Sequence, residues 1–179
     1  MIRKANLNDP EAIRDLVNTY AARELMLPRA LNEVYEDLRD FFVYEVGGRI
    51  LGCAALHVCW EGLGEVRSLA VAEDMVGRGI GRQLVEACLG EARVLGMGRV
   101  FVLTYVPEFF RRFGFREYPK EQLPHKVWTD CLKCHKFPNC DEIAMLIELD
   151  DGRFAVRRTR SPSGDPGEGD GAEQAPDAQ

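Results

Sequence analysis

Three glycines within five residues stand directly before an apolar-periodic run: Gly77, Gly79 and Gly81 in the stretch VGRGIGRQLVEA. Because β-prone residues precede them, the pattern predicts a strand, a glycine-rich loop and then a helix. Glycines let the backbone approach an anion closely, and the first N–H groups of a helix have no partner within it. The stretch is therefore expected to bind a phosphate group, with Arg78 and Arg82 adding positive charge.

Two familiar nucleotide-binding patterns do not fit these glycines. The dinucleotide pattern GxGxxG fails because Leu84 occupies its last position, and the lysine of the Walker pattern is missing. Ordinary helix caps or tight turns would give the same glycine spacing. The loop alone therefore leaves both a phosphate site and a purely structural role open.

A cysteine cluster forms the second group of residues with chemical potential. The stretch CLKCHKFPNC contains Cys131, Cys134 and Cys140, with His135 beside them. Three thiolates at this spacing suit zinc, with a histidine as a fourth ligand, but the second C-x2-C of a full zinc ribbon is missing. A zinc site and a loop of reduced thiols are the two interpretations. The other three cysteines lie in apolar patterns typical of buried positions: Cys53, Cys59 and Cys88.

The composition indicates one globular domain. The chain has 179 residues, 46% of them hydrophobic and 29% charged, and a net charge of −6, which does not favour nucleic-acid binding. It shows neither an uncharged apolar stretch long enough to span a membrane nor a secretory signal, so a cytoplasmic protein with reduced thiols is expected. We expect the domain to cover residues 1–156, and an acidic tail rich in glycine and proline, residues 157–179, to be disordered.

Periodicity predicts the elements that position these residues. Helical spacing of apolar side chains indicates helices over residues 6–24, 81–96 and 107–115, and a further helix within residues 27–40, after a loop that contains Pro28 and Arg29. Asn8 or Asp9 is the expected cap of the first helix. β-prone runs indicate strands at residues 2–4, 41–46, 50–60, 64–71, 99–104 and 142–149. The order predicts an α/β fold, a mixed central sheet flanked by helices.

The segment RSLAVAEDMVGRGIGRQLVEAC resembles the acetyl-CoA-binding segment of the GNAT acetyltransferase superfamily. The Q/R-x-x-G-x-G/A motif of that family falls on Val76 to Gly81, with Val76 where Gln or Arg is usual. The likeness continues through RVFVLTYVPEFFRRFGFREY and covers residues 2–150. It implies acetyl-CoA as co-substrate, bound through backbone N–H groups. The implied cofactor-binding residues are Leu69, Ala70, Val71, Val76, Gly77, Arg78, Gly79, Ile80, Gly81 and Arg82.

Three further stretches are similar to the N-acetylglutamate synthase family, especially its short bacterial members: GEVRSLAV, VFVLTYVPEFFRRFGF and LPHKVWTDCLKCHKFPNCDEIAM. This resemblance implies L-glutamate as acceptor and the first step of arginine biosynthesis as the reaction. An amino dicarboxylate needs basic partners. The resemblance implies Arg29 and Lys126 as substrate-binding residues, and Arg67 is a third candidate. Each of these three side chains could instead be a solvated surface charge or part of a structural ion pair.

Period-two alternation offers a structural alternative for Arg67 in particular. It places Glu65, Arg67, Leu69 and Val71 on one face of their strand, so Arg67 could simply pair with Glu65.

The resemblance also implies a mechanism. Glu65 matches the family's general base, which removes a proton from the acceptor ammonium directly or through a water. Backbone N–H groups around Ser68 and Leu69 are the expected oxyanion donors. The tyrosine that many members use as acid is replaced by Phe109 and Phe110. Tyr105, Ser68 and Tyr118 remain candidate donors, and the thiol can also leave without an acid.

Other functions stay open from the sequence. A GNAT enzyme could act on a different small amine or on a protein N-terminus, and a non-catalytic acyl-CoA or metal sensor would fit the phenylalanines and the thiols. Edge strands of such sheets often pair across a two-fold axis, so a homodimer is a further expectation.

Overall fold

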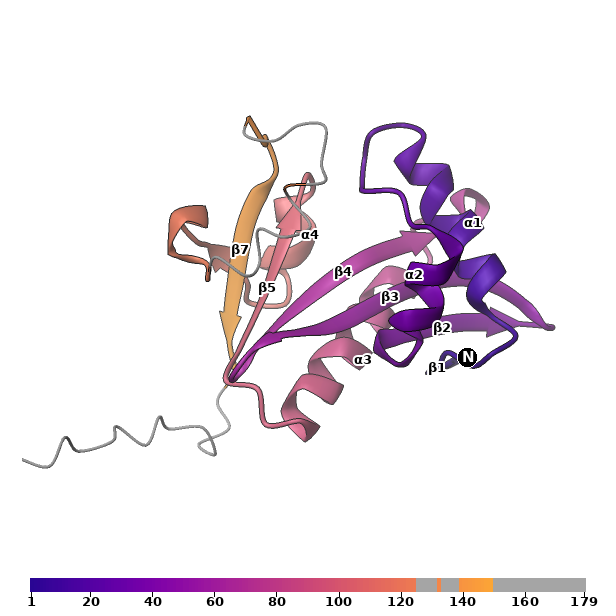
Figure 1. The fold of residues 1–179 in the computed structure, drawn as a ribbon, viewed down its shortest axis with the longest axis horizontal. Coiled ribbons are helices and arrows are strands. Elements are labelled where there is room, and N and C mark those ends of the chain that lie inside the picture. Colours follow the sequence, from indigo (N-terminus) through magenta and orange to yellow (C-terminus); the bar gives the residue numbers. More distant parts are fainter. Residues whose placement is uncertain (125–131, 133–138, 150–179) are drawn as a thin grey trace, which may run out of the picture.

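A seven-stranded mixed sheet in the order β1-β2-β3-β4-β5-β7-β6 organises the protein (Figure 1). The computed structural model describes residues 1–124, 132 and 139–149. The strands are β1 (Ile2–Lys4), β2 (Phe41–Val46), β3 (Arg49–Trp60), β4 (Leu63–Val71), β5 (Arg99–Thr104), β6 (Arg116–Glu117) and β7 (Ile143–Glu148). The helices are α1 (Pro10–Ala21), α2 (Leu31–Glu36), α3 (Ile80–Val94) and α4 (Pro107–Arg111), with 3₁₀ turns η1 (Leu38–Asp40), η2 (Glu73–Met75) and η3 (Lys120–Gln122). The expected α/β class is confirmed.

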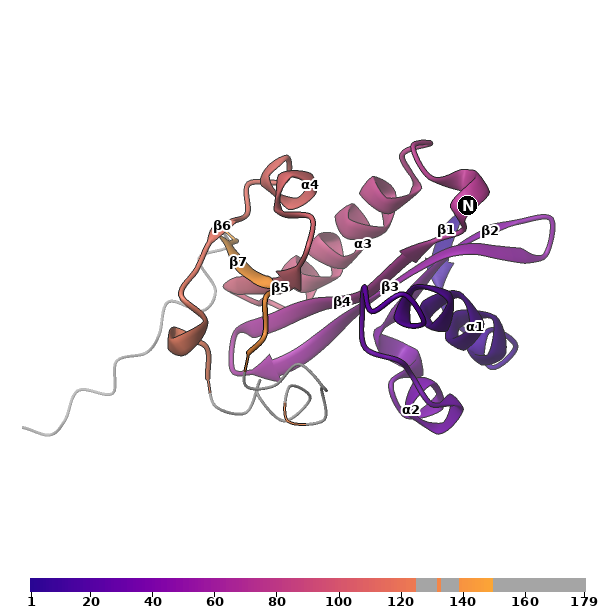
Figure 2. The ribbon, with the colours of Figure 1, turned by 90° about the horizontal axis from the view of Figure 1, so that it is seen from above.

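Helices cover both faces of the β1–β4 part of the sheet (Figure 2). On one face α1 and α2 bury Ile13, Val17 and Val34 against β2 and β3. On the other face α3 buries an apolar stripe that includes Leu84 and Cys88. These are the positions that the helical periodicity marks, and burying them gives each helix its place on the sheet.

The start of α1 differs from the expected cap. Asp9 occupies the N-cap position, but its side chain caps no helix N–H group. It instead accepts two hydrogen bonds from the Arg3 guanidinium, at 2.7 and 2.9 Å, and one from the Asn6 N–H at 2.7 Å. The Arg3 contact holds the pKa of Asp9 below its usual value. Asp9 therefore ties the first strand to the first helix.

The second helix, α2, follows a loop that contains Pro28 and Arg29, as predicted, and ends at Glu36. In this loop the Asn18 side chain makes two hydrogen bonds to the backbone of Arg29. Its amide donates to the Arg29 carbonyl at 3.0 Å, and its oxygen accepts from the Arg29 N–H at 2.9 Å. Glu33 then accepts from the Ala30 N–H at 2.9 Å as α2 begins. The loop is therefore a fixed support for Arg29.

Strands β4 and β5 meet along a short parallel seam. Only Leu63–Glu65 pair with Arg99–Phe101, and beyond these residues the two strands diverge (Figure 1). The seam begins at an apex where the Gly62 carbonyl accepts the N–H groups of Gly98 and Arg99, each at 3.0 Å. The Gly98 carbonyl accepts the Leu149 N–H at 2.9 Å, which brings the end of β7 to the same point. The sheet thus opens from one corner.

A β-bulge interrupts β4 at Ser68. Arg67 pairs with Ala55 and Ala70 pairs with Cys53, so two residues of β4 lie opposite Ala54 alone. Ser68 has a φ of +53°, in the left-handed region. The extra residue reverses which face the later side chains occupy. The prediction that Leu69 and Val71 share a face with Glu65 and Arg67 is therefore wrong: both pack against the core under α3.

The expectation about membranes is tested only in the described part of the chain. There, no helix combines the length and the apolar character that a membrane span requires. The tail expected at residues 157–179 lies outside the described residues.

Candidate active site

The glycine-rich loop connects β4, through η2, to the N-terminus of α3. Gly77 and Gly79 have φ angles of +85° and +77°, which residues with a Cβ rarely adopt. The first backbone hydrogen bond of α3 runs from the Gln83 N–H to the Gly79 carbonyl, at 3.1 Å. The N–H groups of Ile80, Gly81 and Arg82 consequently have no acceptor inside the helix. This is the anion-binding arrangement that the sequence predicts.

The side chains of this loop leave its backbone accessible. Ile80 is buried and anchors the start of α3, whereas Val76 is 62% exposed and Arg78 is also exposed. Arg82 is exposed and pairs with Glu86 at 2.8 Å. A methyl group added to Gly81 would lie 3.5 Å from the Phe109 ring, so α4 packs beside the loop. An anion here would be bound mainly by backbone N–H groups.

The last residues of β4 lead into the loop. Ala70 is buried against the α1 core, and Leu69 and Val71 pack toward α3. The Tyr20 hydroxyl of α1 donates to the Val71 carbonyl. A bulge leaves one residue outside the regular ladder, so Ser68 and Leu69 supply the expected candidates for oxyanion N–H donors.

Glu65 lies where the seam ends. It pairs with Phe101 of β5 on one side and with His57 of β3 on the other. The Cys59 Sγ lies 4.0 Å from a Glu65 carboxylate oxygen. Strand alternation places Glu65 on the same face as Arg67, opposite α3, because Val66 between them packs under α3. The candidate base therefore faces the α1–α2 side of the opening.

Arg29 and Arg67 come together at Asp37, the residue that follows α2. Arg67 Nη2 lies 2.7 Å from Asp37 Oδ2, and Arg29 Nη1 lies 3.8 Å from the same oxygen. The side chains are 13% (Arg29), 10% (Arg67) and 25% (Asp37) exposed. We call these three residues the Asp37 cluster. The sequence predicts both arginines as site residues and does not predict that they meet at Asp37, because a carboxylate one residue beyond a helix carries no local signal of a partner on a distant strand.

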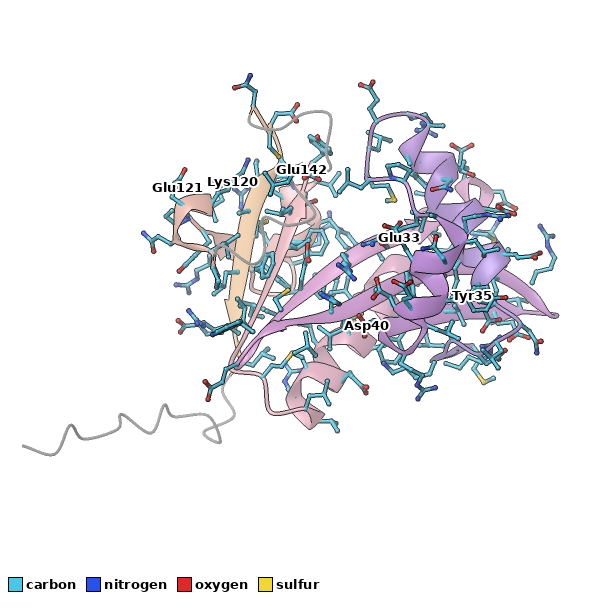
Figure 3. All side chains as sticks on the ribbon, in the orientation of Figure 1. Glu33, Tyr35, Asp40, Lys120, Glu121 and Glu142 are labelled. Atoms are coloured by element: carbon cyan, nitrogen blue, oxygen red, sulfur yellow. The ribbon has the colours of Figure 1, made fainter. Side chains whose placement is uncertain are left out.

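A contact between His57 and Asp40 lies beside the Asp37 cluster. His57 Nδ1 is 2.7 Å from Asp40 Oδ2, and Figure 3 shows Asp40 next to α2. One ligand atom from each of Asp37, Asp40 and His57 fits within 4.8 Å, a set that metal ions accept by residue type. Two guanidinium groups already bind Asp37, however, and their positive charge opposes a cation there.

Several predicted residues lie partly or wholly outside the described chain. Lys126, Cys131 and Cys134 fall outside it, so the structure leaves the zinc prediction untested. Cys140 is described: its Sγ lies 3.7 Å from a Glu142 carboxylate oxygen, and its carbonyl accepts the Lys120 ammonium at 2.9 Å. Cys53 and Cys88 are buried, and burial raises the pKa of each thiol to about 12, as expected for small core residues.

The phenylalanines that replace the usual acid are packing residues. Phe110 is 2% exposed and makes an edge-to-face contact with Phe109, with ring centres 5.0 Å apart. Among the candidate donors, Tyr105 at the end of β5 donates to Asp141 at 2.8 Å. Tyr118 packs against the small core formed by β4, β5 and β7. A role of either phenol as acid stays a prediction.

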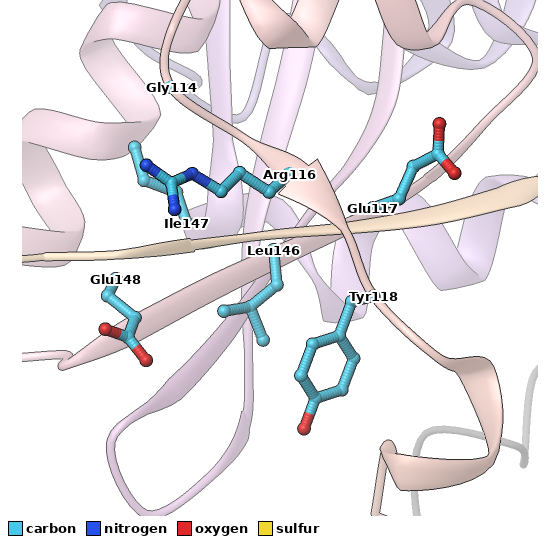
Figure 4. A pocket seen from close by; sticks show the side chains of 7 residues that line it. All are labelled: Gly114, Arg116, Glu117, Tyr118, Leu146, Ile147 and Glu148. Atoms are coloured by element: carbon cyan, nitrogen blue, oxygen red, sulfur yellow. The ribbon is translucent and has the colours of Figure 1, made fainter.

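A hollow lies at the other edge of the sheet, around β6 and β7 (Figure 4). Its lining comprises Gly114, Arg116, Glu117, Tyr118, Leu146, Ile147 and Glu148. Charged residues of both signs line it, and it includes neither the glycine loop nor the Asp37 cluster. Tyr118 is its one overlap with the predicted residues, so this hollow is separate from the candidate site.

Comparison with known proteins identifies the family. The profile described as acetyltransferase (GNAT) domain matches residues 37–117. An uncharacterized N-acetyltransferase of Chlorobaculum tepidum is 43% identical over 83% of this chain and 96% of its own. The chain belongs to the GNAT acetyltransferases.

The names of two further relatives of this GNAT acetyltransferase indicate which acceptors those relatives use. An amino-acid acetyltransferase of Mycobacterium tuberculosis is 45% identical over 75% of this chain and 79% of its own. The N-acetylglutamate synthase of Neisseria gonorrhoeae, solved with coenzyme A and N-acetyl-glutamate, superposes with a TM-score of 0.77 at 25% identity. That similarity covers 84% of this chain and 35% of the Neisseria chain.

Proposed function

We propose that this GNAT acetyltransferase transfers the acetyl group of acetyl-CoA to the α-amine of L-glutamate, a step toward arginine. The names of its relatives support an amino acid as acceptor. The bound N-acetyl-glutamate of the Neisseria structure supports glutamate in particular. The observation that carries the proposal is the Asp37 cluster, since two scarcely exposed guanidinium groups at one point suit a carboxylate of the acceptor.

Acetyl-CoA would bind on the side of the glycine loop. The pyrophosphate group would accept hydrogen bonds from the backbone N–H groups of residues 77–82. These groups are fixed donors at the N-terminus of α3, the positive end of the helix dipole. The pantetheine arm would run along the diverging edge of β4, past Leu69 to Val71, and bring the thioester toward Ser68. The loop binds through its backbone, which explains why Val76 can stand where relatives carry Gln or Arg.

Glutamate would bind on the face that carries Glu65 and Arg67. Arg29 and Arg67 would together bind one of its carboxylates, and Lys126 stays a proposed partner for the other. Glu65 lies two residues from Arg67 on the same face of β4, a separation of about 6.6 Å along a strand. An amino acid is long enough to place one carboxylate at the arginines and its amine at Glu65.

The reaction is aminolysis of a thioester. Glu65, directly or through a water, takes a proton from the α-ammonium, and the freed lone pair attacks the thioester carbonyl carbon. The N–H groups at the Ser68 bulge stabilise the oxyanion. The C–S bond then breaks and the coenzyme A thiolate takes a proton from water or from the nitrogen of the intermediate. One proton leaves the site for each amide formed.

The test is coenzyme A release from acetyl-CoA with L-glutamate, L-aspartate, L-glutamine, a simple amine or no acceptor. We expect turnover that strongly favours glutamate. Glu65→Gln should lower kcat by about 10²- to 10⁴-fold, because it removes the general base, and should leave the KM for acetyl-CoA near its original value. Glu61→Gln, at an exposed position of the preceding turn, is the matched control and should remain active.

Other results would redirect the assignment. Equal turnover of a simple amine would indicate a different small-amine acceptor. Binding of acetyl-CoA with no turnover of any acceptor would overturn the proposal and leave an acyl-CoA sensor as the better description.

A further inference from the structure

We propose that Asp37 is a positioning residue for acceptor binding: one of its carboxylate oxygens holds Arg29 and Arg67 together as a single carboxylate-binding unit. This inference rests on the proposed function, since it names the residue that prepares the glutamate site. Asp37 itself carries the wrong charge to contact a carboxylate. Its role would be to fix the two guanidinium groups before the acceptor arrives.

The backbones of both arginines are already anchored. The Asn18 side chain fixes the backbone of Arg29 through two hydrogen bonds, at 2.9 and 3.0 Å. Arg67 belongs to β4 and pairs with Ala55 of β3, just before the bulge. Long arginine side chains nonetheless lose substantial conformational entropy when a ligand orders them. A carboxylate that meets both side-chain ends reduces that cost before binding.

Electrostatics favours the same role. Two guanidinium groups with 13% and 10% exposure repel one another, because both are largely shielded from water. One carboxylate between them offsets this repulsion, and the three side chains together carry one net positive charge. The neighbouring Asp40 carboxylate is in contact with His57, at 2.7 Å. Asp37 thus lowers the cost of holding the two arginines close together before a ligand binds.

A purely structural brace is the alternative. Asp37 follows α2, so its contacts also fasten this helix to the sheet. A brace and a positioning residue make different kinetic predictions. Loss of a brace lowers stability and the amount of active enzyme, whereas loss of a positioning residue raises the KM for the acceptor and spares the KM for acetyl-CoA.

The experiment measures kcat, both KM values and Tm for the wild type, Asp37→Asn, Asp37→Glu and Glu36→Gln. Asp37→Asn removes the charge with little change of shape, and we expect the KM for glutamate to rise about tenfold or more. The KM for acetyl-CoA should stay within about twofold. Asp37→Glu keeps the carboxylate on a longer arm and should recover part of the loss. Glu36→Gln changes the same charge at the adjacent exposed position and should match the wild type.

The outcomes separate this inference from the proposed function. Wild-type enzyme that fails to acetylate glutamate overturns the proposed function and this inference with it. Wild-type enzyme that acetylates glutamate, with an Asp37→Asn variant of lower Tm and unchanged KM for glutamate, overturns the inference alone. Should Asp37→Asn not fold, Asp37→Glu decides: the positioning role requires a several-fold rise in its KM for glutamate over that of Glu36→Gln.

Discussion

The glycine loop and the Asp37 cluster lie at the same opening of the sheet and are built in contrasting ways. The loop is one continuous stretch, from Val76 to Arg82, that presents backbone N–H groups at the start of α3. The Asp37 cluster joins side chains from the loop before α2, the end of α2 and strand β4. We expect the first to tolerate changes of side chain but not of backbone angle. We expect the second to tolerate neither the loss nor the displacement of its side chains.

Of the variants that test this comparison, we expect the largest effect from substitutions in the Asp37 cluster. Arg29→Ala and Arg67→Ala should each raise the KM for glutamate by about 10- to 100-fold, because each removes charge-assisted hydrogen bonds worth about 1.5–3 kcal/mol. The double variant should lose less than the product of the two effects, since both arginines share Asp37. Steady-state kinetics of the four enzymes measures this coupling.

The control for that cycle is Arg49→Ala, at the exposed first position of β3. It removes the same charge elsewhere on the protein and should leave the KM for glutamate unchanged. If the two site variants behave like Arg49→Ala, the acceptor carboxylates bind elsewhere. Strictly multiplicative effects would show that the two arginines bind independently.

A smaller effect is expected from a substitution in the glycine loop. Gly79→Ala places a Cβ on a residue with a φ of +77° and should cost about 1–2 kcal/mol of stability. It should also raise the KM for acetyl-CoA, because the strained cap displaces the first N–H groups of α3. Gly90→Ala lies within the same helix, with open space around the added carbon, and should stabilise by about 0.5–1 kcal/mol. Thermal unfolding and acetyl-CoA kinetics of both variants measure the expected opposite shifts in stability. A Gly79→Ala enzyme as stable and as active as Gly90→Ala would contradict the role of the loop.

The smallest effect is expected from the hydrogen bond that joins Tyr20 of α1 to the end of β4. Tyr20→Phe removes the hydrogen bond from α1 to the Val71 carbonyl, which precedes the loop, and should cost about 1 kcal/mol. Burial raises the pKa of Tyr20 above its ordinary value of 10. The stabilisation by Tyr20 is therefore fully present below pH 10 and is lost as the pH rises through the higher pKa of the folded state. Denaturant unfolding of both proteins from pH 7 into the alkaline range should show their difference shrink. A difference that stays constant would contradict this assignment.

Local features of the site were predictable from the sequence because their causes are local. The glycines, the following helix and the strands at residues 41–46, 50–60 and 64–71 follow from residue types a few positions apart, and the structure places them within a residue or two. Ile13 and Val17 are buried as the helical period requires. In such segments the pattern and the structure have the same origin, namely the faces that a helix or a strand presents to the core.

The errors arise where long-range contacts decide the outcome. The bulge at Ser68 is a property of the pairing between β3 and β4, so strand alternation alone misplaces Leu69 and Val71. Asp9 turns from its helix to Arg3 because that guanidinium reaches it from β1. Asp37 was missed for the same reason. A single sequence reports which side chains are charged, but not which of them meet.

Strands β4 and β5 are joined only near the apex at Gly62 and Gly98, so a small rotation there is magnified at their far ends. Strand β4 runs nine residues from the corner at Gly62 to Val71, about 30 Å at 3.3 Å per residue. A rotation of about 5° about the corner that joins β4, β5 and β7 would therefore move the far end of the strand by about 2.6 Å. The separation of β4 and β5 at their far ends accordingly depends on the backbone at Gly62 and Gly98.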